Sequence, residues 1–128
     1  MSAYAIANLK ELDDLAAQRE GDIEARVART HLESEHLGVS YFRYGQGYRS
    51  PIGHRHREQE EAYVVVSGSG RVKLDDEIVE LREWDVVRVA PHVVRSFEGG
   101  PEGLELVAIG SDRPEGGDGE MIPDHWDQ

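Results

Sequence analysis

Residues 54–68 read HRHREQEEAYVVVSG, and this stretch decides both the fold class and the candidate site of the chain. His54 and His56 are two residues apart, so in an extended segment their side chains project to the same face. Glu61 can return to that face from the next strand. Two neutral imidazoles and one carboxylate are a ligand set that Zn, Ni, Mn or Fe accepts, with positions left open for water or substrate. The spacing therefore predicts a divalent-metal site at these three residues.

A simpler interpretation of residues 54–57 is a pair of solvent-facing histidines in an arginine-rich strand. The spacing from this pair to Glu61 and to Gly68 favours a shared pocket instead. The acidic run at residues 58–60 is expected to be a solvated turn. Three other histidines have no partner at a comparable spacing and are expected at the surface: His31, His36 and His125.

The same stretch resembles the first motif of the cupins, G-x5-H-x-H-x3,4-E-x6-G, in which two histidines and a glutamate bind metal inside a small β-barrel. Four positions match in residue type and spacing: His54, His56, Glu61 and Gly68. Tyr48 stands at the place of the leading glycine. The resemblance covers about Leu37 to Ile109 and implies an all-β fold, a cupin-like double-stranded β-helix (jelly-roll barrel). It also implies assembly as a homodimer.

The second cupin motif, G-x5-P-x-G-x2-H-x3-N, is kept less well over residues 84–99. The alignment places Trp84 and His92 at its two glycines, Ala90 at its proline and Gly99 at its asparagine. Arg95 falls at the position of the metal-binding histidine. A guanidinium stays protonated and cannot ligate a metal, so the site has at most three protein ligands.

Arg95 leaves three interpretations of the pocket open. In the first, a divalent metal stays on the three ligands and Arg95 holds a small anionic molecule beside it, which resembles the chemistry of cupin oxygenases and isomerases. In the second, the pocket is a metal-free anion-binding or sensor barrel in which Arg95 pairs with Glu61. In the third, that pair is only structural. The candidate ligand-binding residues are Arg95, Tyr63 and Phe97, and the sequence does not decide whether the chain is an enzyme.

Outside this stretch, the sequence pattern predicts many short strands and one helix. Asn8 can cap a helix over residues 9–19, which Gly21 would end. Glycines at residues 68 and 70 predict a tight hairpin after the strand at 62–66. The other predicted strands cover residues 24–30, 37–44, 71–74, 78–81, 85–89, 93–97 and 104–109. Short strands at close spacing, with one short N-terminal helix, indicate an all-β barrel or sandwich.

The chain has 128 residues and no long linker, so we expect a single domain. Residues 1–36 are expected to form an N-terminal helix and strand of that domain, and residues 37–110 the barrel core. Residues 111–128 form a tail rich in Gly, Asp and Pro. Its apolar side chains, Met121, Ile122 and Trp126, predict that the tail packs on the barrel.

Composition narrows the classes of partner and chemistry. The absence of cysteine excludes disulfides, iron–sulfur clusters, thiolate zinc sites and cysteine nucleophiles. A net charge of −12 opposes binding to nucleic acid or to an anionic membrane. No apolar run approaches a membrane span, and the first residues lack the features of a signal peptide, so the expected location is cytoplasmic. The expected partners are a small anionic molecule and a second copy of the chain.

Overall fold

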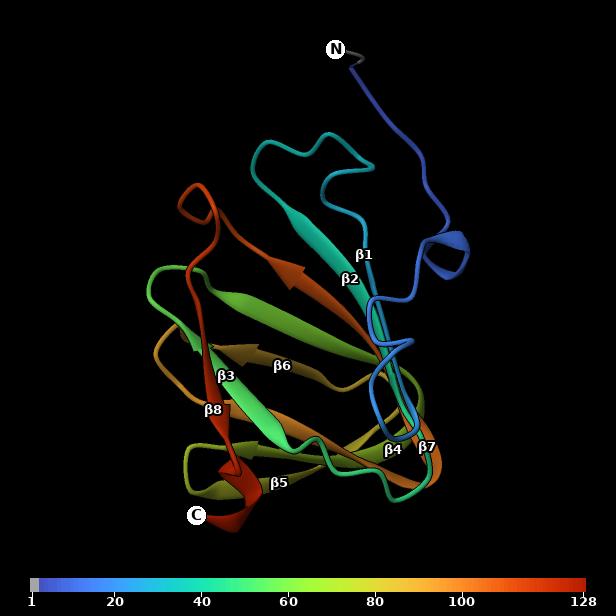
Figure 1. Cartoon of the computed structure of the whole chain (residues 1–128), viewed down its shortest axis with the longest axis vertical. Coiled ribbons are helices and arrows are strands. Elements are labelled where there is room, and N and C mark those ends of the chain that lie inside the picture. Colours follow the sequence, from blue (N-terminus) through green and yellow to red (C-terminus); the bar gives the residue numbers. More distant parts are fainter. Residues whose placement is uncertain (1–2) are drawn as a thin grey trace.

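The computed structural model describes residues 3–128 as one curled, eight-stranded antiparallel sheet that forms a barrel (Figure 1). The strands are β1 (Ile23–Val27), β2 (Gly38–Tyr44), β3 (Ile52–His56), β4 (Glu61–Leu74), β5 (Glu77–Arg82), β6 (Val86–Val89), β7 (Arg95–Gly110) and β8 (Gly119–Pro123). Two short 3₁₀ turns, η1 (Leu9–Glu11) and η2 (His125–Asp127), complete the set. The prediction of an all-β barrel is confirmed.

The two long strands, β4 and β7, hold the barrel together. The second half of β7 lies between β2 and the first half of β4, while its first half pairs with the end of β4 and, at Arg95, with His54 of β3. β4 also pairs with β6 and then with β5. β8 closes this side by pairing along β3 (red beside green in Figure 1). The strand that carries both histidines is therefore framed by β7 and the C-terminal segment.

The predicted helix over residues 9–19 is wrong. Only one 3₁₀ turn forms, at Leu9–Glu11, with the predicted cap in place because the side chain of Asn8 accepts a hydrogen bond from the Lys10 N–H. Further along, the carboxylate of Asp14 accepts the N–H groups of Ala16 and Ala25, at 2.9 and 3.0 Å. These bonds compete with helical ones and tie the segment to β1. No helix among residues 3–128 has both the length and the apolar character needed to cross a membrane.

The predicted hairpin at residues 67–70 is also wrong, because β4 runs straight through it. Gly68 has a φ of +77°, and the pairing with β7 shifts register on either side of it. A Cβ atom at Gly68 would collide with the carbonyl oxygen of Gly103, and one at Gly70 with that of Glu98. These glycines therefore serve a β-bulge and the close approach of β7 rather than a chain reversal. The second predicted hairpin, over residues 71–81, is confirmed as β4 and β5.

The apolar core fills one part of the barrel and borders a cavity. Val65, Val72, Leu104 and Leu106 are fully buried on the inner face of β4 and β7. Three aromatic side chains belong both to this core and to the cavity wall: Tyr44, Tyr63 and Phe97. Their rings pack in sequence, with centroids 5.7 Å apart for Tyr44 and Phe97 and 4.8 Å for Tyr63 and Phe97. The wall of the candidate site is thus formed in part by packed aromatic side chains of the core.

Candidate metal centre

The structure brings His54, His56 and Glu61 together at one point. The two histidines project to the same side of β3, and Glu61 is the first residue of β4. His54 Nε2 lies 3.3 Å, and His56 Nε2 3.1 Å, from Glu61 Oε1. One donor atom from each residue falls within 4.8 Å of the others. A sequence separation of seven residues is thus closed by the turn between β3 and β4.

These donor separations fit a divalent metal. Zinc binds imidazole nitrogen at about 2.0–2.1 Å in tetrahedral geometry, which puts neighbouring ligand atoms roughly 3.3 Å apart. The two observed nitrogen-to-oxygen distances, 3.1 and 3.3 Å, lie close to this value. The nitrogen and oxygen donors also suit Ni, Mn and Fe. The residues present therefore suit the ion that the spacing predicts.

Asp118, in the tail before β8, fixes the orientation of His56. His56 Nδ1–H donates to Asp118 Oδ1 at 2.8 Å, and Asp118 Oδ2 accepts the backbone N–H groups of Glu58 and Gln59. Burial opposes ionisation of this carboxyl, but the three hydrogen bonds outweigh burial and lower the pKa of Asp118 to about 2. With its Nδ1 committed as a donor, a neutral His56 presents a lone pair on Nε2 toward Glu61.

Sequence reasoning missed Asp118. It lies in the run Gly-Gly-Asp-Gly, where composition predicts only a loop, and its partner His56 is 62 residues away. Gln59 was expected in a solvated turn but is buried, and its side-chain amide donates to the Ser111 carbonyl. The Asp118 carboxylate draws the β3–β4 turn inward by accepting two of its backbone N–H groups, which accounts for the difference.

Glu61 is held as an anion by its neighbours. The Tyr63 hydroxyl donates to Glu61 Oε1 at 2.5 Å, on the oxygen that also faces both histidines. Burial alone would raise the pKa of Glu61, but the hydrogen bonds from His54, His56 and Tyr63 bring it well below its ordinary value. Burial, followed by the nearby charge of Glu61, raises the pKa of Tyr63 well above its ordinary value. Tyr63 therefore stays a neutral donor to an ionised Glu61.

Arg95 lies next to this group but does not line the cavity. Its side chain is 0% exposed, Nη2 donates to the Ala90 carbonyl at 3.0 Å, and Nη1 lies 4.0 Å from Glu61 Oε1. Nε and Nη1 have no hydrogen-bond partner among residues 3–128. The Ala90 carbonyl and Glu61 hold the guanidinium in the cavity wall beside the three donors, and its role as a ligand contact stays a prediction. Its positive charge lies next to the Glu61 carboxylate, which lines the cavity.

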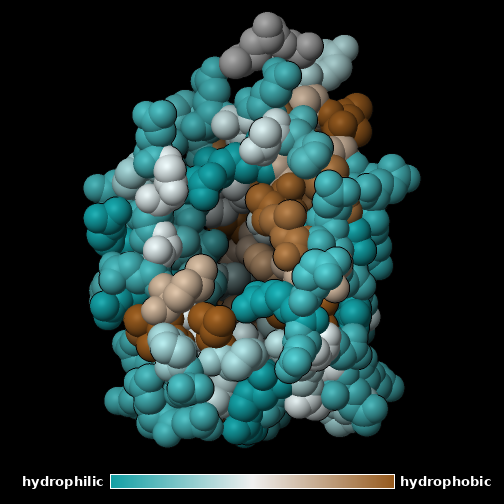
Figure 2. All heavy atoms as spheres, in the orientation of Figure 1, coloured by the Kyte–Doolittle hydropathy of each residue, from teal (hydrophilic) through white to brown (hydrophobic). Residues whose placement is uncertain are grey.

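The cavity beside the three donors has a volume of about 510 Å³, within the range of small-molecule sites. Tyr63 and Phe97, two of the predicted ligand contacts, line it together with His54, His56 and Glu61. Apolar residues of β1 and β2 form much of the opposite wall. Figure 2 shows a hollow in this face of the molecule, with hydrophobic side chains inside it and mostly hydrophilic residues around the rim.

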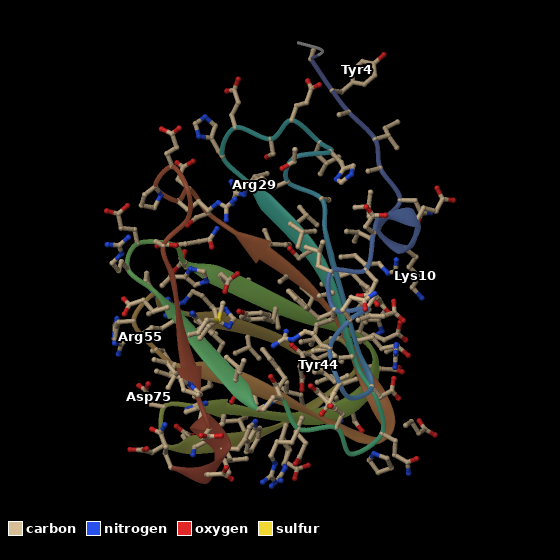
Figure 3. The ribbon with its side chains drawn as sticks, viewed as in Figure 1. Tyr4, Lys10, Arg29, Tyr44, Arg55 and Asp75 are labelled. Atoms are coloured by element: carbon tan, nitrogen blue, oxygen red, sulfur yellow. The ribbon has the colours of Figure 1, made fainter. Side chains whose placement is uncertain are left out.

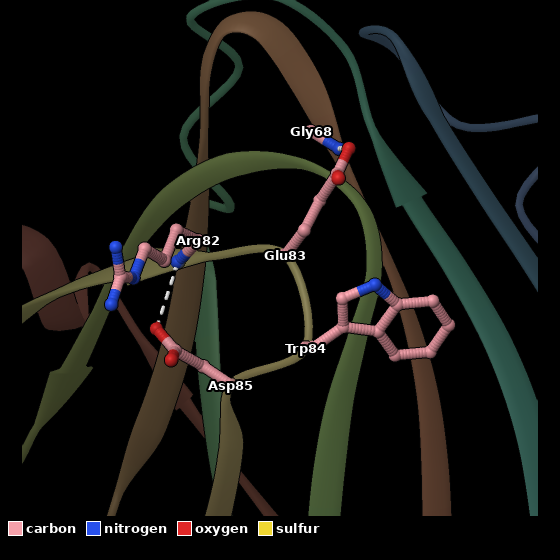
Figure 4. Close-up of a pocket in the computed structure, with 5 residues that line it drawn as sticks. All are labelled: Gly68, Arg82, Glu83, Trp84 and Asp85. Atoms are coloured by element: carbon pink, nitrogen blue, oxygen red, sulfur yellow. Dashed lines mark hydrogen bonds between the residues drawn. The ribbon is translucent and has the colours of Figure 1, made fainter.

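A second depression surrounds the turn between β5 and β6 and contains none of the predicted site residues (Figure 4). Here the Arg82 N–H donates to Asp85 Oδ2 at 2.9 Å, and Glu83 accepts the N–H of Gly68. Trp84 adopts a φ of +71°, and 71% of its surface is exposed. The depression is shallow and has no converging donor set, so the cavity at His54 is the better candidate site.

The three histidines that were expected at the surface divide into two groups. His31 and His36 are exposed as predicted, whereas His125 is buried and the prediction for it is wrong. The ring of His125 lies between Ser96 Oγ, 2.6 Å from Nδ1, and the Asp75 carbonyl, 2.9 Å from Nε2. It anchors the C-terminal segment against the barrel and takes no part in the cavity.

Comparisons with known proteins agree with this architecture. A search of curated protein sequences finds no match. Among solved structures, the chain is similar to a cupin protein from Bacteroides fragilis, with a TM-score of 0.72 and 22% identity over 89% of this chain and 88% of that one. It is similar to the polyketide cyclase RemF from Streptomyces resistomycificus, with a TM-score of 0.72 and 16% identity over 92% and 83%.

A third similar structure is the Streptomyces nucleoside dehydratase Pac13, with a TM-score of 0.69 and 17% identity over 91% of this chain and 89% of that one. At such identities these likenesses show the fold alone. The sequence itself matches the family model of the cupin domain over residues 40–110, more than half of the chain. With the barrel and this match together, the chain belongs to the cupin family.

Proposed function

We propose that this chain is a small-molecule-binding cupin with a three-ligand metal site at His54, His56 and Glu61, and that the bound metal acts on a molecule held in the cavity. One observation carries the proposal. Asp118 engages Nδ1 of His56, so the ring turns Nε2 toward Glu61 Oε1, which lies 3.1 Å away. When the ring is neutral and its proton is on Nδ1, both of these atoms are acceptors, and a cation placed between them is attracted by both.

A divalent ion held by these three residues would supply a Lewis acid that lowers the pKa of a bound water molecule. The protein supplies the rest. Tyr63 orients the Glu61 carboxylate, Asp118 orients His56, and the side chain of His54 is 31% exposed and open to the cavity. The apolar wall displaces water from an incoming molecule. The similar structures of a polyketide cyclase and a nucleoside dehydratase support small-molecule chemistry in a barrel of this kind.

Metal removal and replacement tests the proposal. Purified protein treated with a chelator is titrated with Zn, Ni, Mn and Fe(II), and bound metal is measured by calorimetry and elemental analysis. We expect one equivalent of at least one ion to bind. The variants His54→Ala, His56→Ala and Glu61→Gln should each weaken binding at least tenfold, because a three-ligand site keeps too few donors after losing one.

His36→Ala is the matched control, since His36 is an exposed histidine outside the cavity. It should bind metal like the wild-type protein, and all four variants should keep the wild-type circular dichroism spectrum. A wild-type protein that takes up none of the four ions would contradict the metal proposal.

A second candidate function is a metal-free anion-binding barrel, favoured by the ion pair of Arg95 with Glu61. Burial lowers the pKa of His56, but its hydrogen bonds to Glu61 and Asp118 outweigh burial and raise it. A proton on Nε2 can therefore take the place of the metal between His56 and Glu61. Failure of metal uptake, together with binding of a small carboxylate, would make this the better function.

A further inference from the structure

Among the residues that line the cavity, arginines outnumber carboxylates, although the protein as a whole is strongly acidic. The whole chain carries a net charge of −12, yet three arginines line the cavity: Arg19, Arg29 and Arg113. Only two carboxylates line it, Glu61 and Asp118, and both are engaged by histidine. The arginines come from three separate segments, so their convergence is produced by the fold and not by a local run of basic residues.

Arg29, in the connection from β1 to β2, is half-buried and poorly satisfied. Among residues 3–128, one of its five donor groups is used, because Nη2 donates to the Ser111 carbonyl at 3.2 Å. The guanidinium packs against Gly38, where a Cβ atom would collide with it. In Figure 3 Arg29 lies beside the loop that follows β7. Its position is therefore fixed by the fold, while most of its hydrogen-bonding capacity stays free.

Arg113 brings a second positive charge to the same place. It forms no hydrogen bond or ion pair with any group in the 3–128 range, and it lines the cavity beside the glycines of the tail. Burial, and then the charge of Arg113, lower the pKa of Arg29, while Asp112 opposes this more weakly. Asp112 itself is bound to His36. Two guanidinium groups whose charges repel each other are stabilised when an anion bridges them.

The arginine pair is connected to the metal centre along one wall. The carbonyl of Ser111 that binds Arg29 also accepts the side-chain amide of Gln59. The backbone N–H of Gln59 donates to Asp118, which in turn holds His56. A molecule bound by the two arginines therefore lies in the same cavity as the three metal donors.

The wall contributed by β1 and β2 is mostly apolar, and its polar side-chain groups are the hydroxyls of Ser40 and Tyr44. Ile23, Ala25 and Phe42 supply apolar surface to the cavity here. A ligand that matches both features has an acidic head for the guanidinium groups and an apolar body for this wall. A free inorganic anion would leave the apolar surface wet, and a neutral ligand would leave the arginine charges uncompensated.

We propose that Arg29 and Arg113 bind the acidic head of an organic anion, a carboxylate or phosphate monoester with an apolar body, at the mouth of the cavity. This proposal rests on the proposed function, in which the cavity binds a small molecule, and it adds the chemical class of that molecule. The anion contact is thereby assigned to the mouth rather than to Arg95, which is buried in the wall.

Three probes of one shape test the proposal: benzoate, phenyl phosphate and neutral benzamide. Binding to chelator-treated protein is followed by NMR titration. We expect both anions to bind at least tenfold more tightly than benzamide, and Arg29→Gln and Arg113→Gln each to weaken anion binding at least tenfold. Preference between the two anions identifies the acidic head. Arg82→Gln, which removes the same charge outside the cavity, is the control and should change binding less than twofold.

Equal binding of benzamide and benzoate, or arginine variants that bind the anions like wild type, would overturn the inference. His54→Ala separates this result from the metal proposal, because that variant should lose metal and keep its arginine-dependent anion binding. If metal binds but Arg29 and Arg113 are irrelevant, only the inference fails. If no metal binds and the arginines still matter, only the metal proposal fails.

Discussion

Asp118 is the residue that determines which nitrogen of His56 is free to bind a metal. It accepts the Nδ1 proton and is itself fixed by two backbone N–H groups. Carboxylates in this role raise the basicity of the imidazole and hold its ring in place, and their loss costs about 10- to 100-fold in metal affinity. The metal centre therefore extends beyond its three ligands into the C-terminal tail.

Replacing Asp118 with Asn tests this role. The variant keeps a hydrogen-bond acceptor but loses the charge, so we expect metal affinity to fall by at least tenfold, or about 1.4 kcal/mol. Calorimetric titration with Zn or Ni is the measurement. Asp112→Asn, an exposed carboxylate in the same loop, is the control. Equal affinities in Asp118→Asn and wild type would show that His56 needs no partner to bind metal.

Arg95 places a buried positive charge near the metal position. Because this charge repels a divalent ion, Arg95→His should raise metal affinity at least tenfold, or about 1.4 kcal/mol, by removing the repulsion and adding a neutral nitrogen donor. Arg95→Met removes the charge and adds no donor, so comparison of the two variants separates the causes. Both are titrated with Zn or Ni by calorimetry. No gain in either variant would mean that Glu61 already cancels the charge of Arg95.

The three ligand positions were predictable because their information is local. Two histidines at a spacing of two residues, with Glu61 a short turn away, need only a strand and a turn to converge. Asp118 and Arg29 were not predictable, since each acquires its role from contacts with segments far away in the sequence. The position of Arg95 followed from the motif, but its direction depends on the Ala90 carbonyl, which no residue pattern reveals.

At the scale of elements, alternating apolar residues identified most strands, and errors arose where one residue type serves two purposes. A glycine permits a reversal and also permits close approach of a neighbouring strand, and at Gly68 and Gly70 the second use applies. Aspartate begins helices and also interrupts them. At Asp14 its carboxylate binds the backbone of β1 in place of a helical turn.

The C-terminal segment is held by a charged cluster around Trp126. Arg49 and Arg71 lie 4.7 and 5.6 Å from its ring centroid, and Glu98 pairs with both arginines at 2.7 Å. Lys73 donates to the carbonyls of His125 and Gln128 from the buried side. The segment that carries η2 thus depends on ion pairs as well as on apolar packing.

Glu98→Gln should lower the free energy of unfolding by about 1 kcal/mol at pH 7. Burial raises the pKa of Glu98, but hydrogen bonds from Arg71 and Arg49 outweigh burial and lower it. A lowered pKa gives stability that is present above the ordinary glutamate value of about 4.3 and is lost as the pH falls through the folded value. The difference between wild type and variant should therefore shrink below about pH 4.

Urea unfolding of both proteins at pH 7, 5 and 3 is the measurement. Glu102→Gln, an exposed glutamate on the same strand, is the control and should show no such pH dependence. A difference between Glu98→Gln and wild type that stays constant with pH would show that the ion pairs do not contribute.

At the scale of the whole molecule, the outer face of the sheet exposes apolar side chains. Val86 is paired opposite Val64, and Ile109 opposite Ala62, on the face away from the cavity. Val86 is 62% exposed and Ile109 is 41% exposed, and Trp84, in the turn that leads into the strand of Val86, is 71% exposed. An exposed apolar strip of this kind is typical of a subunit interface.

We predict a homodimer formed through this face. Light scattering at micromolar concentration should give about twice the chain mass of 14.3 kDa, and Ile109→Asp should reduce the mass to that of one chain. Ile6→Asp, which adds the same charge at a 91% exposed position of the N-terminal segment, should leave the mass unchanged. A wild-type monomer at every accessible concentration would refute the prediction.

The cavity itself belongs to this largest scale, which is why the sequence did not reveal its charge. Its positive lining comes from the segment before β1, the β1–β2 connection and the tail, in a chain whose overall balance is acidic. Composition averages over the whole surface and cannot show that cations gather in one hollow. The sequence therefore predicted an anionic partner from Arg95, whereas the structure supports one through Arg29 and Arg113.

The unequal anchoring of the three donors has a consequence for the size of ion they can accept. Glu61 starts β4, which pairs with β6 and β7 from this first residue on, whereas β3 pairs with β7 only at His54 and Arg95. The backbone of Glu61 is thus paired on both sides, whereas the two histidines lie on a strand that pairs mainly with β8. We expect the β3–β8 pair to adjust more readily than β4 when ions of different radius bind. This site should therefore distinguish ions by their preferred ligands more sharply than by their ionic radius.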